Sequence, residues 1–281
     1  MVFISDETLD RMIAEDIPYL DLTTHLLGIS GKHGTIRYFS REETVVCGTE
    51  EAARILARLG VEVTGFQPSG AVVQPGQFLL EGKGLAEALH MGWKICQNLL
   101  DNCSAIATKT KRMVDIVHSV DPRMSVVTTR KNFPGIKALC VKAVLCGGGL
   151  PHRLGLSETV LVFRQHLNFM GGMSSFISML PSIKEHSCEK KIIAEAETME
   201  EAIALCEAGI DGVQFDKLTA EELMEGVPRL RDIAPNAALL ASGGINESNA
   251  DKYAATGVNA LVTTSLYTAK PIDIGAKIEQ S

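Results

Sequence analysis

The second half of the chain alternates short apolar runs with helical segments, and this alternation restricts its fold more than any other feature. Two of the helical segments start with capping boxes, in which Thr198 pairs with Glu201 and Thr219 with Glu222. Alternating units of this kind predict a parallel sheet covered by helices. The runs expected to form buried strands are 124–129, 158–163, 191–196, 212–216, 237–242 and 260–265. They are fewer than the eight strands of a complete α/β barrel.

The first 107 residues follow a different pattern. A helix is expected to start at Thr49, as its N-cap, and to end at Gly60. Residues 61–84 are divided into short strands by proline- and glycine-rich turns, and 85–107 return to helical spacing. We therefore expect an α+β N-terminal domain over 1–107 and an α/β barrel domain over 108–268.

Composition and charge restrict the class of protein. The chain of 281 residues carries a net charge of −7 and has no basic block, which argues against nucleic acid or an anionic membrane as partner. Its seven cysteines form no CxxC pair, and we interpret them as core residues of a protein from a reducing compartment. The start has no secretory pattern, and no apolar run has the length of a membrane span. A cytoplasmic location is expected.

Two cationic pairs flank the segment that carries most of the expected chemistry. Arg130 and Lys131 follow the run 124–129, and cations at the end of a buried strand are costly to leave unpaired. Taken alone, such a pair would be a solvated surface feature. The second pair, His152 and Arg153, follows three consecutive glycines, which allow a ligand or backbone to come close. Together the pairs favour an anion-binding site.

Acidic and small residues stand at the ends of the other expected strands. Glu195 and Asp216 end two successive runs, and Thr264 lies near the end of the last. Each acid alone could pair with a nearby lysine, but two acids facing Lys131 favour a functional site at the carboxyl edge of the sheet. Ser242-Gly243-Gly244 precedes a helix for which Asn246 is the expected N-cap, an arrangement that suits a phosphate and also serves as a tight turn.

The motifs TRK-x-x-PG (129–135) and GGG-x-x-HR-x-GL (147–156) resemble those of the quinolinate phosphoribosyltransferases, also called carboxylating nicotinate-nucleotide pyrophosphorylases. The resemblance extends from EDIPYLDLTT (15–24) to TTSLYT (263–268). It implies an incomplete α/β barrel, packing of 269–281 with the N-terminal domain, and a homodimer or dimer-based oligomer. It also implies a type II enzyme that transfers phosphoribose from phosphoribosyl pyrophosphate to an aromatic carboxylic acid, quinolinate or a related one, with release of pyrophosphate.

The resemblance also implies residue roles. The ring carboxylates would be bound by Arg130, His152 and Arg153, with Lys94 reaching in from a second subunit. The sugar pyrophosphate would be held by Lys131, Glu195 and Asp216, the two acids also holding magnesium. The phosphate would be bound by Ser242, Gly243, Gly244 and Thr264.

Three ligand-binding positions depart from the family pattern. The family segment KDNH is replaced by Phe163-Arg164-Gln165-His166, so that Phe163 takes the place of a lysine that contacts a carboxylate. Arg164 and His166 remain candidate substrate-binding residues, although neighbours on a strand point to opposite faces. Lys94 replaces an arginine, which changes its hydrogen-bonding geometry, and Thr264 replaces a glycine.

The departures and the tail 261–278 are similar to the ModD branch of the family, encoded beside molybdate transporters. The loss of one cation predicts an acceptor with fewer carboxylates, or a different aromatic acid, and poor turnover of quinolinate. Two alternatives stay open. One is a nonenzymatic binding or regulatory protein of molybdate physiology that retains the pocket. The other is an unrelated barrel lyase that uses Lys131 as a Schiff base.

Overall fold

A computed structural model describes residues 2–281 and divides the chain into two compact units. The first unit contains the chain up to Lys111 together with 132–148 and 267–281, and the second contains 112–131 and 149–266. The division therefore falls within the long helix α4 (Ala86–Val120) and not at the expected residue 107. The segment 132–148 joins the first unit because the apolar side chains of its helix belong to that unit's core.

The first unit is built on an antiparallel sheet with the strand order β13-β1-β5-β3. The central strand β1 pairs with β5 on one side and with the C-terminal strand β13 on the other, so the end of the chain returns to this unit. The strands are β1 (His33–Ser40), β3 (Glu62–Phe66), β5 (Phe78–Leu85) and β13 (Ile274–Gln280), with a separate pair β2 (Thr44–Val45) and β4 (Val72–Val73). The helices are α1 (Asp6–Asp16), α2 (Leu22–Leu26), α3 (Thr49–Arg58), α4 and α5 (Lys137–Cys146).

The start of α3 differs by one residue from the expected start. Gly48 is the N-cap, with φ of 95°, and Thr49 is the first helical residue. A side chain at Gly48 would place its Cβ 2.5 Å from Cδ2 of Leu99, so both the backbone conformation and the packing require glycine there. The Thr49 hydroxyl instead donates to the carbonyl of Gln67, 2.7 Å away.

The second unit is an incomplete barrel of seven parallel strands with the order β7-β6-β12-β11-β10-β9-β8, which confirms the predicted architecture. Its strands are β6 (Ser125–Thr128), β7 (Leu150–Pro151), β8 (Val160–Val162), β9 (Ile192–Ala196), β10 (Gly212–Asp216), β11 (Ala238–Ser242) and β12 (Ala260–Thr263). The strand missed from the sequence, β7, has only two residues. Because β7 and β8 are consecutive in the chain but form opposite edges of the sheet, the loop 152–159 connects its two open edges.

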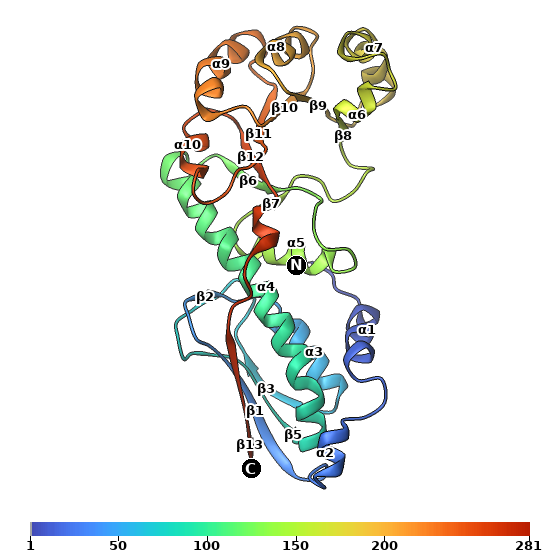
Figure 1. Cartoon of the computed structure of the whole chain (residues 1–281), viewed down its shortest axis with the longest axis vertical. Coiled ribbons are helices and arrows are strands. Elements are labelled where there is room, and N and C mark those ends of the chain that lie inside the picture. Colours follow the sequence, from blue (N-terminus) through green and yellow to red (C-terminus); the bar gives the residue numbers. More distant parts are fainter. Residues whose placement is uncertain (1) are drawn as a thin grey trace. The chain divides into compact units, whose positions relative to one another are not determined.

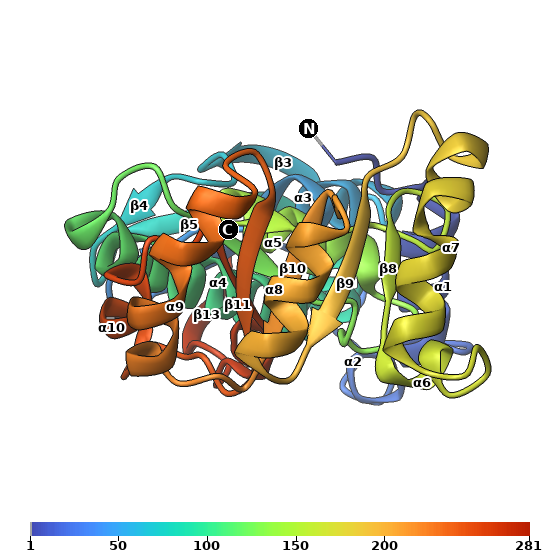
Figure 2. The ribbon, with the colours of Figure 1, turned by 90° about the horizontal axis from the view of Figure 1, so that it is seen from above.

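Helices cover the outer face of this sheet. They are α6 (Arg164–Leu167), α7 (Met173–His186), α8 (Met199–Glu207), α9 (Ala220–Ile233) and α10 (Ala250–Ala254), and a 3-10 turn, η1 (Ser265–Thr268), follows the last barrel strand. In Figure 1 the strands of this unit form the inside of an arch and α7–α10 its outside, and Figure 2 shows α8 and α9 lying over the strands.

The helix starts of the second unit correct two expectations. Thr219 and Glu222 form the predicted reciprocal capping box. Thr198 accepts from the Glu201 amide, but the Glu201 carboxylate bonds to the Glu197 amide instead of completing a box. The expected cap at Asn246 is wrong, because α10 begins only at Ala250, is five residues long and is preceded by Asn249.

The two faces of the barrel strands are packed differently. Side chains such as Ala194, Phe215 and Leu239 belong to the core between sheet and helices. Alternate side chains, among them Ile193 and Leu240, form a smaller apolar cluster on the inner face. Side chains alternate along a strand, so residues two positions apart point to the same face. Glu195 and Ser242, two positions after Ile193 and Leu240, therefore lie at the ends of their strands on the inner face.

The cysteines differ in part from their expected roles, and one glycine of the run 147–149 lies where backbone comes close. All seven cysteines are free and five are buried, but Cys146 is half-buried and Cys188 is exposed. In the glycine run, Gly147 lies against α4: a Cβ there would be 2.4 Å from the Ala107 carbonyl oxygen. Of the two expected reasons for the glycines, Gly147 therefore serves the close approach of backbone. Among residues 2–281, no helix combines the length and the apolar character needed to cross a membrane.

Candidate active site

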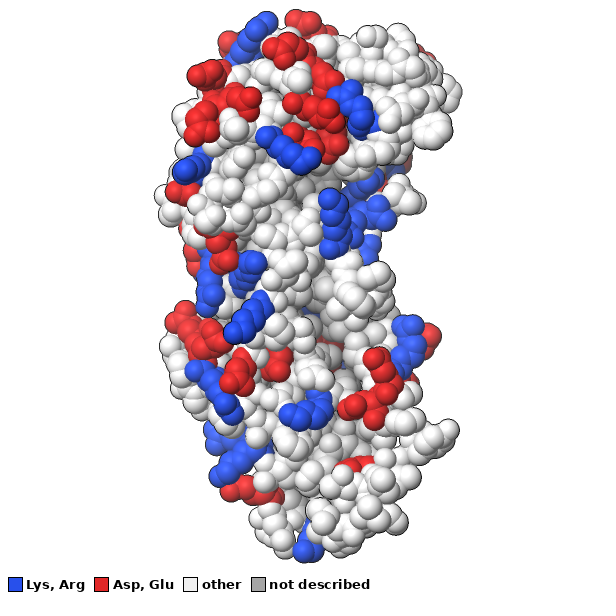
Figure 3. Space-filling model, in the orientation of Figure 1, with Lys and Arg blue, Asp and Glu red and all other residues white. Residues whose placement is uncertain are grey.

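A cavity of about 900 Å³ opens at the carboxyl ends of the barrel strands and is lined by the second unit alone. It brings together residues that are up to 136 positions apart, from Thr129 to Ser265. The predicted site residues that line it are Arg130, Lys131, His152, Arg153, Glu195, Asp216, Ser242, Gly243, Gly244 and Thr264. On the face drawn in Figure 3, acidic and basic side chains are interspersed except for a group of Lys and Arg side chains beside the half barrel.

Two carboxylates mark the ends of neighbouring strands. Glu195 lies on β9 beside Gln214 of β10, whose side-chain amide donates to Glu195 Oε1 over 3.2 Å. Burial raises the pKa of Glu195, the charge of Asp216 raises it further, and the charge of Lys131 acts in the opposite direction. The carboxylates and Lys131 therefore form one electrostatically linked group.

Three cationic or imidazole side chains line another part of the cavity. His152 is held by its backbone amide, which donates to the Thr128 carbonyl over 3.0 Å. Burial lowers the pKa of His152 and the nearby charge of Arg153 lowers it further. Burial also lowers the pKa of Arg153, as does the charge of Arg130. These groups repel one another, so an anion bound among them would be stabilised electrostatically.

One wall beside these cations is apolar. Phe163 follows β8 and packs against the inner-face cluster. The Arg153 guanidinium carbon lies 5.8 Å from the centroid of the Phe163 ring, within the range of a cation–π contact. Phe163, which stands in place of the family lysine, thus contacts Arg153 through its ring and adds no charge of its own.

The glycine turn after β11 has a fixed geometry. Ser242 Oγ donates to the Phe215 carbonyl over 2.8 Å, and Gly243 and Gly244 have φ of 93° and 77°. The side-chain amides of Asn246 and Asn249 donate to the Gly244 carbonyl over 3.0 and 3.2 Å. The expected phosphate site at a helix start is therefore wrong in one respect, because the short α10 begins six residues after Gly244. A phosphate on the turn would therefore not meet the amides of a helix start.

The side chain of Thr264, which follows β12, forms a hydrogen bond with a residue that follows β6. Its hydroxyl lies 2.9 Å from the Thr129 hydroxyl, which also accepts from the backbone amide of Lys131 over 3.2 Å. The threonine that replaces a family glycine therefore stabilises the backbone that carries Lys131.

Three predicted ligand-binding residues lie outside the cavity lining. Arg164 opens α6, where its guanidinium lies 3.0 Å from Glu197 and 2.8 Å from Glu201. His166 accepts from the Phe163 amide over 2.9 Å, which fixes the start of the same helix. Both side chains are already used by local structure because the chain turns into a helix immediately after Phe163. Neither side chain is among the lining residues of the cavity.

The third of these residues, Lys94, belongs to the first unit. It is exposed on α4, 4.4 Å from the Trp93 ring centroid and 3.0 Å from Gln97 Oε1. Its expected role in the site of a second subunit stays a prediction.

Other lining residues were not expected from the sequence. Gln165, Gln214, Lys217 and Asn246 contribute polar groups to the cavity, and Thr129, Thr263 and Ser265 contribute hydroxyls. Position in the chain could have indicated some of them: Gln214 lies two residues before Asp216 on the same face of β10, and Lys217 directly follows Asp216. Gln165 lies in the segment that replaces the family's KDNH, but in the first turn of α6 and not at a strand end.

The acidic groups fit magnesium only together with substrate oxygens. Magnesium is commonly held by one or two carboxylates plus phosphate oxygens and water, and Glu195 and Asp216 supply the two carboxylates. Within residues 2–281, no group of three or more His, Cys, Asp or Glu side chains is arranged to hold a metal ion. When bound, the ion would supply positive charge between carboxylates and phosphates.

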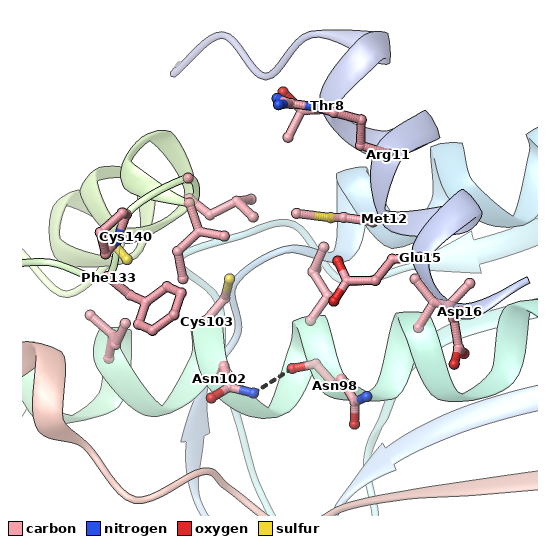
Figure 4. A pocket seen from close by; sticks show the side chains of 17 residues that line it. Thr8, Arg11, Met12, Glu15, Asp16, Asn98, Asn102, Cys103, Phe133 and Cys140 are labelled. Carbon is pink, nitrogen blue, oxygen red and sulfur yellow. Dashed lines mark hydrogen bonds between the residues drawn. The ribbon is translucent and has the colours of Figure 1, made fainter. Parts of the chain in front are cut away.

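A second cavity, of about 740 Å³, lies in the first unit between α1, α4 and residues 133–140. Figure 4 shows Met12 and Glu15 of α1 on one side and Asn98 and Asn102 of α4 on the other, with Phe133 nearby. The Asn102 side chain donates to the Asn98 carbonyl over 2.8 Å. None of the predicted site residues lines this cavity, and it lacks the group of cations found in the half barrel.

Cations, two acids and a glycine turn lie at the carboxyl edge of a half barrel, where α/β-barrel enzymes have their active sites. The family model of the C-terminal domain of quinolinate phosphoribosyl transferase matches residues 106–277, and that of the N-terminal domain matches 21–104. The chain belongs to the quinolinate phosphoribosyltransferase family, as its motifs predicted, and it is an enzyme of this phosphoribosyl-transferring class.

Individual relatives agree with this assignment. ModD of Escherichia coli O157:H7 is 34% identical over 279 residues, which cover 99% of this chain and 98% of that protein. The carboxylating nicotinate-nucleotide pyrophosphorylase of Mycobacterium leprae is 32% identical over 276 residues, 96% of this chain and 95% of that one. The structure of the nicotinate-nucleotide pyrophosphorylase from Francisella tularensis has the same fold, with a TM-score of 0.89 at 24% identity, and the match covers 99% of this chain and 98% of that one. The chain is thus similar to the ModD branch over its whole length.

Proposed function

We propose that this enzyme transfers the phosphoribosyl group of phosphoribosyl pyrophosphate to the ring nitrogen of an aromatic carboxylic acid, quinolinate or a related acid, and releases pyrophosphate. The observation that carries the proposal is the convergence of Lys131, Glu195, Asp216 and the glycine turn in one cavity with Arg130, His152 and Arg153. A donor rich in phosphate and an anionic acceptor need this combination of charges side by side. The family assignment supports the transferase over the binding-protein and lyase alternatives.

The reaction needs positioning and charge balance more than a covalent nucleophile. The ring nitrogen donates its electron pair to C1 of the ribose while the C1–O bond breaks, and the departing pyrophosphate keeps that bond's electrons. Positive charge develops on the ribose, where Glu195 and Asp216 stabilise it. Negative charge grows on the pyrophosphate, where Lys131 stabilises it. A magnesium ion would neutralise further phosphate charge when bound.

The acceptor end of the cavity supports an acid with fewer carboxylates than quinolinate. Arg130, His152 and Arg153 are available for carboxylates, while Phe163 supplies an apolar face in place of a cation. An anionic group placed against Phe163 would lose water without gaining a partner. Quinolinate is therefore expected to be a poor substrate, and an aromatic monocarboxylic acid a better one.

We also propose that two copies of the chain complete each site. Lys94 is exposed, and its ammonium contacts the Gln97 side chain and the Trp93 ring and no carboxylate among residues 2–281. In a homodimer it would add a cation to the acceptor end of the neighbouring copy. Sedimentation together with the kinetics of Lys94→Ala tests this: a dimer with an unchanged KM for the acceptor would contradict the role of Lys94.

Calorimetry with phosphoribosyl pyrophosphate and magnesium tests the main proposal. The wild-type protein should bind the donor, and Asp216→Asn should lose binding because one of the two site carboxylates is neutralised. Asp251→Asn is the matched control, since Asp251 is exposed on α10 and does not line the cavity. No binding of the donor by the wild type would overturn the proposal, and steady-state turnover of quinolinate at rates usual for the family would overturn the acceptor assignment.

A further inference from the structure

Lys217 has an unusual backbone conformation at the mouth of the cavity. With φ of 64°, it is the one non-glycine residue of 2–281 in the left-handed region. Lysine gains nothing from this conformation, which suits glycine and asparagine better, and such residues gather at functional sites where their surroundings hold them in place. Here the Lys217 amide donates to the Ser242 carbonyl over 2.8 Å, which ties it to the start of the glycine turn.

The stem of Lys217 lies against Gly243. A Cβ on Gly243 would be 2.5 Å from Cγ of Lys217 and 2.7 Å from its backbone nitrogen. The absence of a side chain at Gly243 therefore makes room for Lys217, and the left-handed backbone brings the lysine over the turn. The sequence pattern Ser-Gly-Gly and the conformation of residue 217 are parts of the same local arrangement.

The ammonium of Lys217 remains available to a ligand. It lies 3.3 Å from Asp216 Oδ2, and the lysine side chain is 78% exposed. Exposed ion pairs are weak, and an ammonium has three donors. It can therefore keep Asp216 as one partner and bind an anion with another donor.

The charge balance at the donor end calls for such a cation. The proposed function assigns Arg130, His152 and Arg153 to the acceptor. Lys131 would then be the one cation left to balance two carboxylates and the phosphates of the donor. The glycine turn supplies amides but is not the start of a helix, because α10 begins only at Ala250. Amides carry no net charge and therefore leave the phosphate charge unbalanced.

We propose that Lys217 is a substrate-binding residue whose ammonium binds the phosphate monoester of the donor, the phosphate that lies on the Ser242-Gly243-Gly244 turn. The identity of the donor rests on the proposed function. The left-handed backbone at residue 217 positions the ammonium, and Gly243 provides the space for it.

The variant Lys217→Asn tests this proposal, since asparagine tolerates the left-handed conformation but carries no charge. Calorimetry with magnesium should show about tenfold weaker binding of both phosphoribosyl pyrophosphate and ribose 5-phosphate, the usual effect of losing one charged hydrogen bond. Lys217→Arg should bind within about threefold of wild type, since it keeps the charge. Lys252→Asn on α10, exposed and outside the cavity lining, is the matched control.

The outcomes are distinguishable. If wild type binds the donor and Lys217→Asn binds it equally well, the role of Lys217 is overturned while the transferase stands. If Lys217→Asn weakens the binding of inorganic pyrophosphate but not of ribose 5-phosphate, the assignment to the phosphate on the turn is overturned. If it lowers the melting temperature without ligand and leaves affinity unchanged, Lys217 is merely structural. If wild type binds no donor at all, the proposed function itself fails.

Discussion

Lys142 Nζ lies 2.8 Å from Oε2 of Glu50 and so joins α5 to α3 in the interior of the first unit. The same ammonium pairs with Glu51, and the side chains of Lys142 and Glu51 are 10% and 5% exposed. In the chain, α5 separates the Arg130-Lys131 pair from the His152-Arg153 pair. A buried ion-pair network thus fixes the helix that connects the two cationic segments of the site.

This network should make the stability of the protein depend on acid pH. Burial would raise the pKa of Glu50, but hydrogen bonds from Lys142 and Ser69 outweigh it and lower the pKa from 4.5 to about 2. The folded state therefore binds this proton less readily than the unfolded state. The stabilisation is complete above pH 4.5 and is lost as the pH falls toward 2.

Urea unfolding between pH 7 and pH 3 measures this dependence. Solvent partly screens the half-exposed Glu50 carboxylate. We therefore expect its ionisation to contribute about 1–2 kcal/mol to the free energy of unfolding at pH 7. Glu50→Gln should flatten this part of the profile. An identical acid profile for the variant and the wild type would contradict the assignment.

Removal of the lysine from the network should be more damaging. Lys142→Met leaves Glu51 buried without its cation, and breaking a buried pair from one side costs about 3–5 kcal/mol. Lys277→Met is the matched control, because the Lys277–Glu279 pair is 64% and 60% exposed and such pairs contribute about 0–1 kcal/mol. Chemical denaturation of both variants measures the difference. Equal losses would mean that the Lys142 network adds nothing beyond a surface pair.

The fold was predictable where local pattern and burial agree. The runs that became β9, β10 and β11 are apolar, bounded by caps and turns, and long enough to be seen. By contrast, β7 contains only Leu150 and Pro151, and a two-residue strand has no periodicity. The segment 132–148 is adjacent in sequence to barrel residues but joins the first unit, because tertiary packing and not local pattern decides which core accepts α5.

The site was predictable where a residue ends a buried strand. Glu195 and Asp216 follow apolar runs, and strand geometry then places them at one edge of the sheet. Arg164 could not be placed in this way, because its partners Glu197 and Glu201 come from the start of another helix. The position of Lys217 directly after Asp216 could have placed it near the site, but its left-handed backbone and its contact with Gly243 have no sequence signal and are seen only in the structure.

The placement of Arg164 leads to a prediction about activity. Since its guanidinium is held by Glu197 and Glu201 outside the cavity, Arg164→Gln should leave the KM values for donor and acceptor within about twofold of wild type. The loss of this partly exposed network should cost about 0–1 kcal/mol of stability. Arg153→Gln is the comparison, because Arg153 lines the cavity, and it should raise the acceptor KM at least tenfold, as expected for a lost charged hydrogen bond. A similar rise for Arg164→Gln would return that residue to the site.

The apolar wall should control the choice of acceptor. Phe163→Lys introduces a cation beside Arg153 and should raise kcat/KM for quinolinate by about tenfold, the effect of one charged hydrogen bond. The same change should lower kcat/KM for an aromatic monocarboxylic acid, because the cation is then left without a partner. Phe163→Leu keeps the wall apolar and should not improve quinolinate turnover. If Phe163→Lys and Phe163→Leu have the same effect on quinolinate, the missing cation does not determine specificity.

The glycine turn permits a comparison of two glycines with similar backbones but different surroundings. At Gly209, with φ of 78°, a Cβ would have no atom within 4 Å, whereas at Gly243, with φ of 93°, it would lie 2.7 Å from the Lys217 nitrogen. Gly209→Ala should therefore lose only the strain of a left-handed alanine, about 1–2 kcal/mol. Gly243→Ala adds a clash with backbone and should lose about 2–4 kcal/mol.

The two alanine variants should also differ in donor binding. In Gly243→Ala the methyl group displaces Lys217 and the turn together, so calorimetry should show a loss of affinity for phosphoribosyl pyrophosphate of at least about tenfold. Gly209→Ala, whose site of change lies outside the cavity lining, should bind the donor as wild type does. If both variants lost the same stability and bound the donor equally well, the contact between Gly243 and Lys217 would have no part in the site.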